Sequence, residues 1–209
     1  MTEKNKHQIL LGIVILVFIW SAISPHDYFT WILEVAPVII VLAIITYYYK
    51  RFKFTTLVYS LVAIHAIILM VGGHYTYADV PLFNDLRDIG LFSRNNYDKV
   101  GHFAQGFVPA MVAREILLRK LGNILMKKGI LNFFLICIAG TISSIYEIIE
   151  WWTSILSGDA GDAFLGTQGY IWDTQSDMFF AFIGAIIAIL LFSKKHDRAL
   201  ACNISNINV

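Results

Sequence analysis

Six apolar segments, each bounded by charged or polar residues, constrain this 209-residue chain more than any other feature. Each segment has about 17 to 23 residues, enough to cross a hydrocarbon core of about 30 Å at about 1.5 Å rise per residue. Of all residues, 57% are hydrophobic and 15% are charged, which is too apolar for an ordinary soluble domain. The sequence therefore predicts an all-α, polytopic transmembrane helical bundle forming a single domain over residues 1–209, with spans at about 8–24, 31–49, 54–72, 100–118, 130–152 and 176–193.

The charged residues are sorted between alternate segments outside these spans. Thirteen of the 16 Lys and Arg residues lie on the side of the two termini, and twelve of the 15 acidic residues lie on the other side. Because Lys and Arg gather in cytoplasmic loops, we expect both termini in the cytoplasm. The lipid bilayer is then the main partner, and a net charge of +1 with scattered basic residues predicts no nucleic-acid partner.

Two long links, residues 73–99 and 153–175, both belong to the acidic side. Links of this length are uncommon unless they are functional or disordered, and both contain many aromatic and aliphatic residues. We therefore expect them to fold over the bundle or to lie in the interface, where an aromatic belt accounts for most of their Trp and Tyr residues. The glycine-rich stretches 158–162 and 166–169 of the second link are interpreted as flexible turns.

Ionisable residues recur at helical spacing at the outer ends of spans four, five and six. Each spacing, i to i+3 or i to i+4, puts two side chains on one face of a helix. Three helices thus present three pairs of side chains at one depth in the membrane. His74 at the outer end of span three could make a fourth contribution. The pairs are Asp98 with His102, Glu147 with Glu150, and Asp173 with Asp177.

These residues are costly to place in a membrane, and three explanations stay open. A carboxylate at the bilayer centre costs about 2.5 to 3.5 kcal/mol on insertion scales, so such groups face a bundle interior or a watery cavity. Neighbouring carboxylates cannot all stay ionised alone. The cluster therefore binds a divalent metal, shares protons, or forms a structural network of ion pairs with Arg87, Arg94 and Lys99.

The metal interpretation assigns a mixed ligand set of histidine and carboxylates, suited to zinc, manganese or iron, that would activate water or polarise a phosphoryl oxygen. Without a metal, His102 would act as a general acid or base oriented by a carboxylate. The candidate metal ligands are His102, Glu147, Glu150, Asp177 and His74. The candidate catalytic residues are His102, Glu147, Asp98, Glu150, Asp173 and Asp177.

Other polar residues are interpreted as structural. His65 lies in the middle of span three, where a lone histidine is more often a hydrogen-bonded packing residue than a ligand. Arg114 and Glu115 approach the basic end of span four and are expected to be interfacial residues whose charged ends reach the headgroups.

Four stretches, residues 73–81, 94–106, 146–151 and 166–178, resemble the bacterial inner-membrane family typified by YjdF. The resemblance covers most of the chain, from span one to span six, and its motifs are specific. It implies a location in the bacterial inner membrane, and it implies no particular activity.

A more distant resemblance, over about residues 94–192, is to VanZ-like membrane proteins. Their pattern of Asp-Lys-x-x-His-Phe, a glutamate-bearing helix and an aspartate that opens the last helix is matched at 98–103, Glu147 and Asp173. Glu150, Gln175 and Ser176 depart from the Gln, Arg and Asn usual there, so a role in glycopeptide resistance is not carried over. The likeness implies a shared polar site at the outer membrane face.

Together these features predict a protein that acts on a lipid-linked or envelope substrate at an extracytoplasmic His/carboxylate site. Two other classes stay open: a small ion- or proton-coupled transporter, and a structural or accessory membrane subunit. A transporter needs a continuous polar path, whereas spans one, two and six contain almost no charged residues along their length.

Overall fold

The computed structural model describes residues 1–121, 127–157 and 168–205, and every regular element in these ranges is an α-helix. This confirms the all-α prediction. The glycine-rich stretch 158–162 and residues 166 and 167 lie outside the described residues. The helices are α1 (Glu3–Ser21), α2 (Tyr28–Tyr48), α3 (Thr56–His74), α4 (Pro81–Asp88), α5 (Tyr97–Leu121), α6 (Lys128–Ser157) and α8 (Asp173–Ser205).

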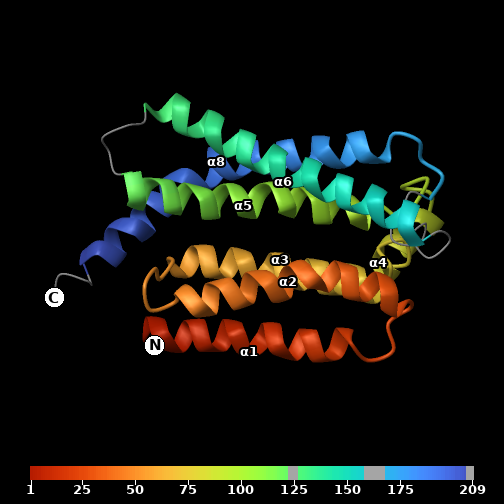
Figure 1. Ribbon diagram of the computed structural model, residues 1–209, viewed down its shortest axis with the longest axis horizontal. Helices are drawn as coiled ribbons and strands as arrows, with labels where there is room; N and C mark the ends of the chain where they lie inside the picture. The colour runs from red at the N-terminus through yellow and green to blue at the C-terminus, as the bar shows by residue number, and fades with distance from the viewer. Residues whose placement is uncertain (122–126, 158–167, 206–209) are drawn as a thin grey trace.

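Six long helices lie side by side and correspond to the six apolar segments (Figure 1). Four of them, α2, α3, α6 and α8, are long and apolar enough to cross a membrane by length and composition. The predicted number of about six spans is therefore approximate. Helices α1 and α5 carry more charge, and in α5 four of the charged residues, Asp98, Lys99, Arg114 and Glu115, are buried against other helices.

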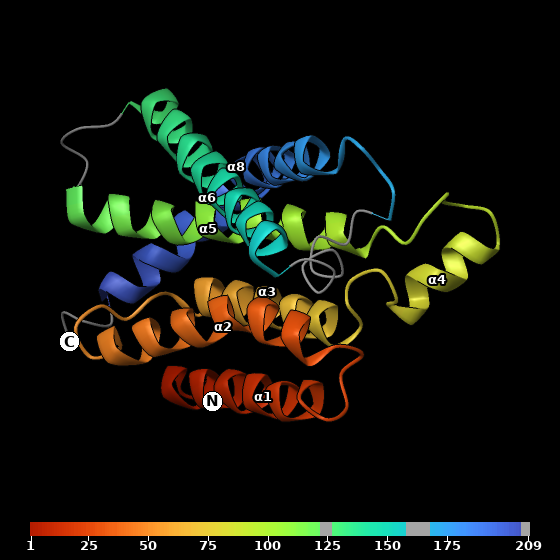
Figure 2. The same cartoon turned by 45° about the vertical axis from the view of Figure 1, so that its right-hand side comes forward.

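The bundle consists of two groups of three helices. One group holds α1, α2 and α3, the other holds α5, α6 and α8, and the contact between α3 and α5 joins them (Figures 1 and 2). An apolar cluster fills this junction, with Val58 and Val62 of α3 against Phe107 and Met111 of α5. The central helix α5 is thereby enclosed by α3, α6 and α8.

Helices α5 and α8 approach each other closely because small residues face one another. A Cβ atom added at Gly106 would overlap the carbonyl of Ala181, and one added at Gly184 would overlap the carbonyl of Phe103. Such small residues let helix backbones meet, which drives helix association in membranes, where lipid offers no hydrophobic contrast. This contact fixes the height of α8 relative to α5, and with it the alignment of their polar ends.

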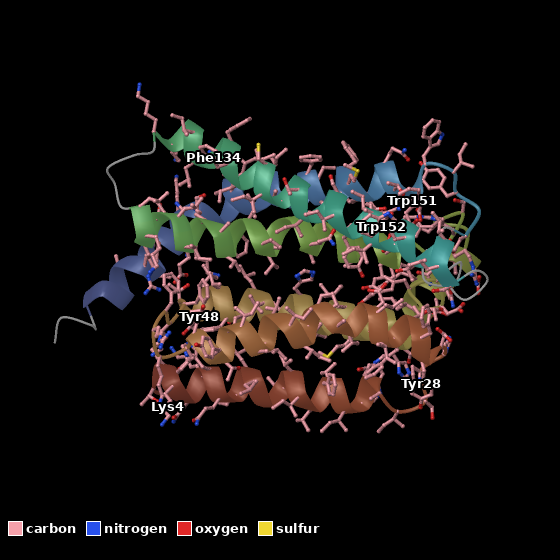
Figure 3. The ribbon with its side chains drawn as sticks, in the orientation of Figure 1. Lys4, Tyr28, Tyr48, Phe134, Trp151 and Trp152 are labelled. Carbon is pink, nitrogen blue, oxygen red and sulfur yellow. The ribbon has the colours of Figure 1, made fainter. Side chains whose placement is uncertain are left out.

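The sorted charges fall at opposite ends of the bundle. The N-terminus, the C-terminal part of α8 and the link between α2 and α3 lie at one end, here called the basic end. Helix α4 and the links that flank it lie at the other, the acidic end (Figures 1 and 2). Aromatic residues mark both ends: Tyr48 lies toward the basic end, as does Lys4, whereas Tyr28, Trp151 and Trp152 lie toward the acidic end (Figure 3). These exposed rings suit the two membrane interfaces.

At the basic end the structure corrects one prediction. Arg114 and Glu115 are not interfacial but buried, with 5% and 0% of their surface exposed. The Glu115 carboxylate accepts hydrogen bonds from the backbone N–H and the hydroxyl of Thr55, at 2.9 and 2.7 Å, and lies 3.0 Å from His196 Nε2. Glu115 of α5 thus contacts the N-cap residue of α3 and a histidine of α8, so it ties three helices together.

Candidate functional site

The six predicted catalytic residues meet at the acidic end. Asp98 and His102 come from the first turns of α5, Glu147 and Glu150 from α6, and Asp173 and Asp177 from the first turns of α8. Each is buried, with between 3% and 8% of its surface exposed. Helical spacing gives each pair a common face, and the packing of α5 against α6 and α8 turns the three faces toward one another.

Part of this cluster is a network of ion pairs. Lys99 Nζ lies 2.8 Å from Asp173 Oδ1, 2.6 Å from Asp177 Oδ1 and 3.3 Å from Asp98 Oδ2. Arg94 contacts Asp98 at 2.9 Å and Asp173 at 2.6 Å. Two cations thus bind three aspartates, which stabilises the junction of α5 and α8 and agrees with the predicted structural network for these residues.

The remaining part of this cluster of acidic residues surrounds His102 and contains few cations. His102 Nδ1 lies 3.7 Å from Glu147 Oε1, His102 Nε2 lies 3.7 Å from Asp177 Oδ1, and Gln105 Oε1 lies 3.2 Å from Nδ1. The two carboxylate distances exceed those of ordinary hydrogen bonds. Within the described part of the chain, the buried Glu147 Oε1 has no hydrogen-bond partner.

A cavity of about 30 Å³ lies beside His102. This volume accommodates a water molecule or a single ion, because a water needs at least about 10 to 15 Å³ by the same measure. Glu147 is not among its lining residues but approaches His102 from the side of α6. The lining residues are Glu34, Leu69, Tyr77, Asp98, Gly101, His102, Gln105, Tyr146, Glu150 and Asp177.

Glu34 and Tyr77 are among the lining residues that the sequence analysis did not assign to the site. Glu34 of α2 is 3% exposed, and its Oε2 accepts a 2.9 Å hydrogen bond from the Tyr146 hydroxyl of α6. Its place brings the single charged residue of span two into the site. The available signal was that Glu34 is the single charged residue of the apolar helix α2.

Tyr77 reaches the cavity from a strained turn. Thr76 and Tyr77 both have positive φ, 53° and 54°, a conformation that costs non-glycine residues energy. The turn places the Tyr77 ring against Gly72 of α3 and Gly101 of α5, where a Cβ atom would collide with or crowd it. Burial, with the nearby Glu34 carboxylate, raises the pKa of Tyr77 well above its usual value, so its hydroxyl stays a neutral donor.

Two predicted participants, His74 and Arg87, lie elsewhere. His74 Nδ1 lies 3.0 Å from the Ser21 carbonyl oxygen, and its ring stacks on Trp20, so the structure does not bring it into the His102 cluster. Arg87 pairs with its neighbour Asp88 near the surface. His65 Nε2 is buried without a hydrogen-bond partner among the described residues, so the hydrogen bond expected of a packing histidine is not seen at this atom.

A larger pocket of about 580 Å³ opens next to the ion-pair network. Its polar wall contains Arg94 and Lys99, and the Arg94 guanidinium lies 5.0 Å from the centre of the Tyr170 ring. The links at the acidic end hold this wall, because Gln168 exchanges hydrogen bonds of 3.2 and 2.8 Å with the backbone of Asn95. The apolar wall consists of Phe83, Phe92 and Phe180.

Two groups of side chains have the spacing of a metal site. In each group, one potential ligand atom per residue lies within 4.8 Å of the others. The first group joins a histidine to two carboxylates, a ligand set typical of zinc, manganese or iron, whereas the second consists of three aspartates that all contact Lys99. Asp177 belongs to both groups, so its contact with Lys99 is part of the first group as well. The groups are His102, Glu147 and Asp177, and Asp98, Asp173 and Asp177.

Comparison with known proteins gives a family. The model of DUF2238, described as a predicted membrane protein, matches residues 6–198. The chain is similar to the inner membrane protein YjdF of Escherichia coli strain K12, with 49% identity over 185 residues that cover 88% of each protein. No solved structure matches the chain.

Proposed function

Because the chain belongs to the DUF2238 family of predicted membrane proteins, we propose that it is a multi-pass inner-membrane enzyme whose His102 cavity is the working site. The name of the E. coli relative and the apolar helices support the inner membrane. With Lys and Arg on the cytoplasmic side, both termini face the cytoplasm and the cavity faces the extracytoplasmic side.

The observation that carries this proposal is an excess of buried acid at the acidic end. Six carboxyl groups, each less than 9% exposed, lie together with two basic side chains, Arg94 and Lys99, whose ion pairs are with Asp98, Asp173 and Asp177. The stretch 158–167, which the structure does not describe, contains no Lys or Arg. A purely structural network would balance its charges, because unpaired buried carboxylates are costly. The six are Glu34, Asp98, Glu147, Glu150, Asp173 and Asp177.

We infer that a divalent metal ion, held by His102, Glu147 and Asp177, compensates the excess negative charge of these carboxylates. One potential ligand atom from each of these residues lies within 4.8 Å of the others. Glu147 approaches His102 Nδ1 and Asp177 approaches His102 Nε2, each at 3.7 Å, so the ion would bind one ring nitrogen and the carboxylate on the other side would turn toward it. Three protein ligands would leave a position for water or substrate. Glu150 and Glu34 line the adjacent cavity and would accept protons from that water.

The larger pocket supports a lipid-linked substrate. Its phenylalanine wall suits an acyl or prenyl chain, while Arg94, Lys99 and the Ser176 hydroxyl suit the polar group attached to that chain. Lys99 lines this pocket and also contacts Asp177 of the proposed metal site. A substrate in the pocket would therefore place its polar group next to the metal, as hydrolysis or transfer of that group requires.

Elemental analysis of the protein purified in detergent without chelator tests the metal. We expect about one zinc, manganese or iron ion per chain, lost in His102→Ala and Glu147→Gln and retained in the control His26→Ala, which changes a histidine outside the cavity. A metal-free wild-type protein would exclude the metal. Variants that unfold would favour a purely structural network.

Lipid analysis of a deletion strain tests the substrate. Complementation with the wild type and with His26→Ala should restore the wild-type profile of envelope lipids and lipid-linked intermediates. Folded Glu147→Gln protein, expressed at the same level, should fail to restore it. An unchanged profile in the deletion strain would count against an envelope-lipid substrate.

A further inference from the structure

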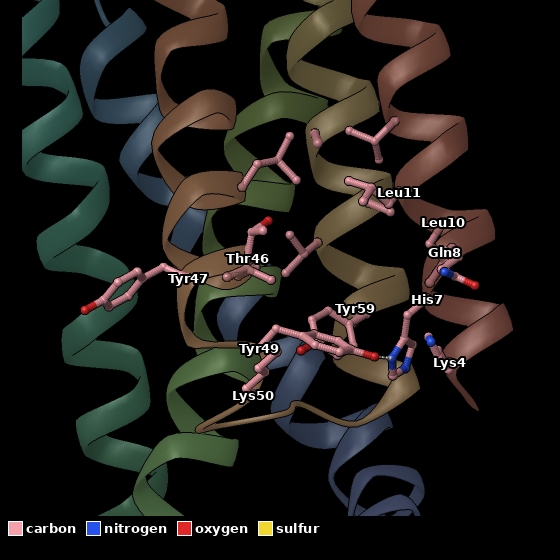
Figure 4. Close-up of a pocket in the computed structure, with 16 residues that line it drawn as sticks. Lys4, His7, Gln8, Leu10, Leu11, Thr46, Tyr47, Tyr49, Lys50 and Tyr59 are labelled. Carbon is pink, nitrogen blue, oxygen red and sulfur yellow. Dashed lines mark hydrogen bonds between the residues drawn. The ribbon is translucent and has the colours of Figure 1, made fainter. Parts of the chain in front are cut away.

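A groove separates α1 from α2 in the basic half of the bundle (Figure 4). Both helices pack on α3, and neither packs extensively on the other within the described residues. Toward the acidic end they are joined, because Trp31 Nε1 donates a 3.1 Å hydrogen bond to Ser21 Oγ and its ring lies 5.8 Å from that of Phe18. Toward the basic end His7 Nδ1 of α1 lies 2.9 Å from the hydroxyl of Tyr49, the residue that follows α2, and the groove opens between these two bridges (Figure 4).

The walls of this groove are apolar, and its volume is about 430 Å³. That volume is within the range of sites that bind small molecules, about 300 to 1,000 Å³. Ala63 and Ala66 of α3 form part of the floor, and their small side chains give the groove its depth. The other apolar lining residues are Leu10, Leu11 and Val14 of α1, Leu42 and Ile45 of α2, and Val62 of α3.

Two lysines lie at the mouth of the groove. Lys4 of α1 and Lys50, just after α2, both line it and are both exposed (Figure 4). Neither forms an ion pair with any described residue, whereas the neighbouring Lys6 pairs with Glu3 at 2.8 Å. The groove thus combines apolar walls with two free positive charges at one end, which is complementary to an amphiphile with an anionic head.

The length of the groove along α1 matches the thickness of one leaflet of the bilayer. From Lys4 to Val14, the helix rises about 15 Å, half of a hydrocarbon core of about 30 Å. A lysine at the mouth would lie at the headgroup level, and the apolar walls would extend toward the middle of the bilayer. Hydrocarbon, not water, fills apolar space that opens to a bilayer.

We propose that this groove holds one acyl chain of an anionic phospholipid, with the headgroup phosphate at Lys4 and Lys50. The lipid belongs to the leaflet at the basic end, where anionic headgroups attract basic side chains. It fills the gap between α1 and α2 and so completes the packing of the first three helices. This site is at the opposite end from the His102 cavity, and its test is independent of the proposed enzyme.

Native mass spectrometry of the full-length protein, released from nanodiscs of equimolar phosphatidylglycerol and phosphatidylcholine, tests the headgroup. We expect one retained lipid per chain, mainly phosphatidylglycerol. The double variant Lys4→Gln/Lys50→Gln should lower this preference by about 30-fold, the effect of two basic residues near an anionic headgroup. Lys194→Gln, which changes an exposed lysine of α8 outside the groove, should leave it unchanged.

The variant Leu11→Trp tests the chain. Leu11 lines the groove and is 41% exposed, so an indole there fills the groove without entering the core. We expect the Leu11→Trp protein to elute like the wild type in size-exclusion chromatography. It should retain neither phosphatidylglycerol nor phosphatidylcholine. The proposal would be overturned if the wild type retained the two lipids equally or retained no lipid at all. Undiminished lipid retention in Leu11→Trp would also overturn it.

Discussion

Tyr146 of α6 donates a 2.9 Å hydrogen bond to Glu34 of α2, and so links the two groups of three helices across the small cavity. Both side chains line that cavity, and Glu34 is 3% exposed. The contact holds a carboxylate of the first group against the His102 cluster of the second. The cavity therefore depends on how the groups dock, not on either group alone.

Tyr146→Phe should destabilise the protein by about 1 to 3 kcal/mol, because a buried Glu34 carboxyl group loses a hydrogen-bond donor. The midpoint of thermal unfolding in detergent measures this. Tyr47→Phe, at an exposed tyrosine of α2, is the matched control and should have little effect. If a Glu34→Ala background, which removes the acceptor, does not change the cost of Tyr146→Phe, the Tyr146 hydroxyl and the Glu34 carboxylate do not interact as described.

Lys99→Met should be among the most damaging substitutions of a charged residue in this chain. It leaves Asp173 and Asp177 buried without their shared cation, and breaking such a pair costs about 3 to 5 kcal/mol. Adding Asp177→Asn should recover part of the loss. Thermal unfolding of the single and double variants measures both effects, with exposed Lys194→Met as the control. A loss no larger than that of the control would contradict the network.

Added metal should raise the unfolding midpoint if the His102 site binds it. At a free Zn²⁺ or Mn²⁺ concentration 100 times the Kd, binding adds about 2.7 kcal/mol, and a chelator should reverse the effect. The shift should vanish in Glu147→Gln and persist in His74→Ala, because His74 contacts Ser21 and Trp20 instead. Loss of the shift in His74→Ala would return that residue to the ligand set.

Gly106→Ala should weaken the contact between α5 and α8, whereas Gly12→Ala should not destabilise α1. The added methyl group at Gly106 would overlap the backbone of Ala181, whereas at Gly12 it would meet no atom within 4 Å. Alanine favours a helix interior over glycine by up to about 1 kcal/mol, so Gly12→Ala should be neutral or stabilising. Opposite signs of the change in unfolding midpoint are expected, and a tolerated Gly106→Ala would show that the two helices can separate at low cost.

Much of the fold could be predicted because its signals are local. Apolar segments of membrane-spanning length lead directly to the long helices, and charges in alternate links lead to the basic and acidic ends. The pairs Asp98 with His102 and Asp173 with Asp177 could be predicted for the same reason, since residues four apart share a helix face whatever the helix packs against.

The grouping of those residues could not be predicted. Arg94 contacts Asp173, 79 residues away, and Glu34 contacts Tyr146, 112 residues away. Glu115 carried a misleading signal, because a charged residue near a helix end is usually interfacial, whereas here partners on two other helices bury it.

The sequence by itself determined that this protein is a bundle of membrane helices with acids gathered at one end, because hydropathy and charge act residue by residue. Only the tertiary structure decided which acids are neutralised by Arg94 and Lys99 and which are left around His102. The reason is geometric: ion pairing requires contact within a few ångströms, and the rotation and height of each helix, set here by close packing at Gly106 and Gly184, determine which side chains come that near.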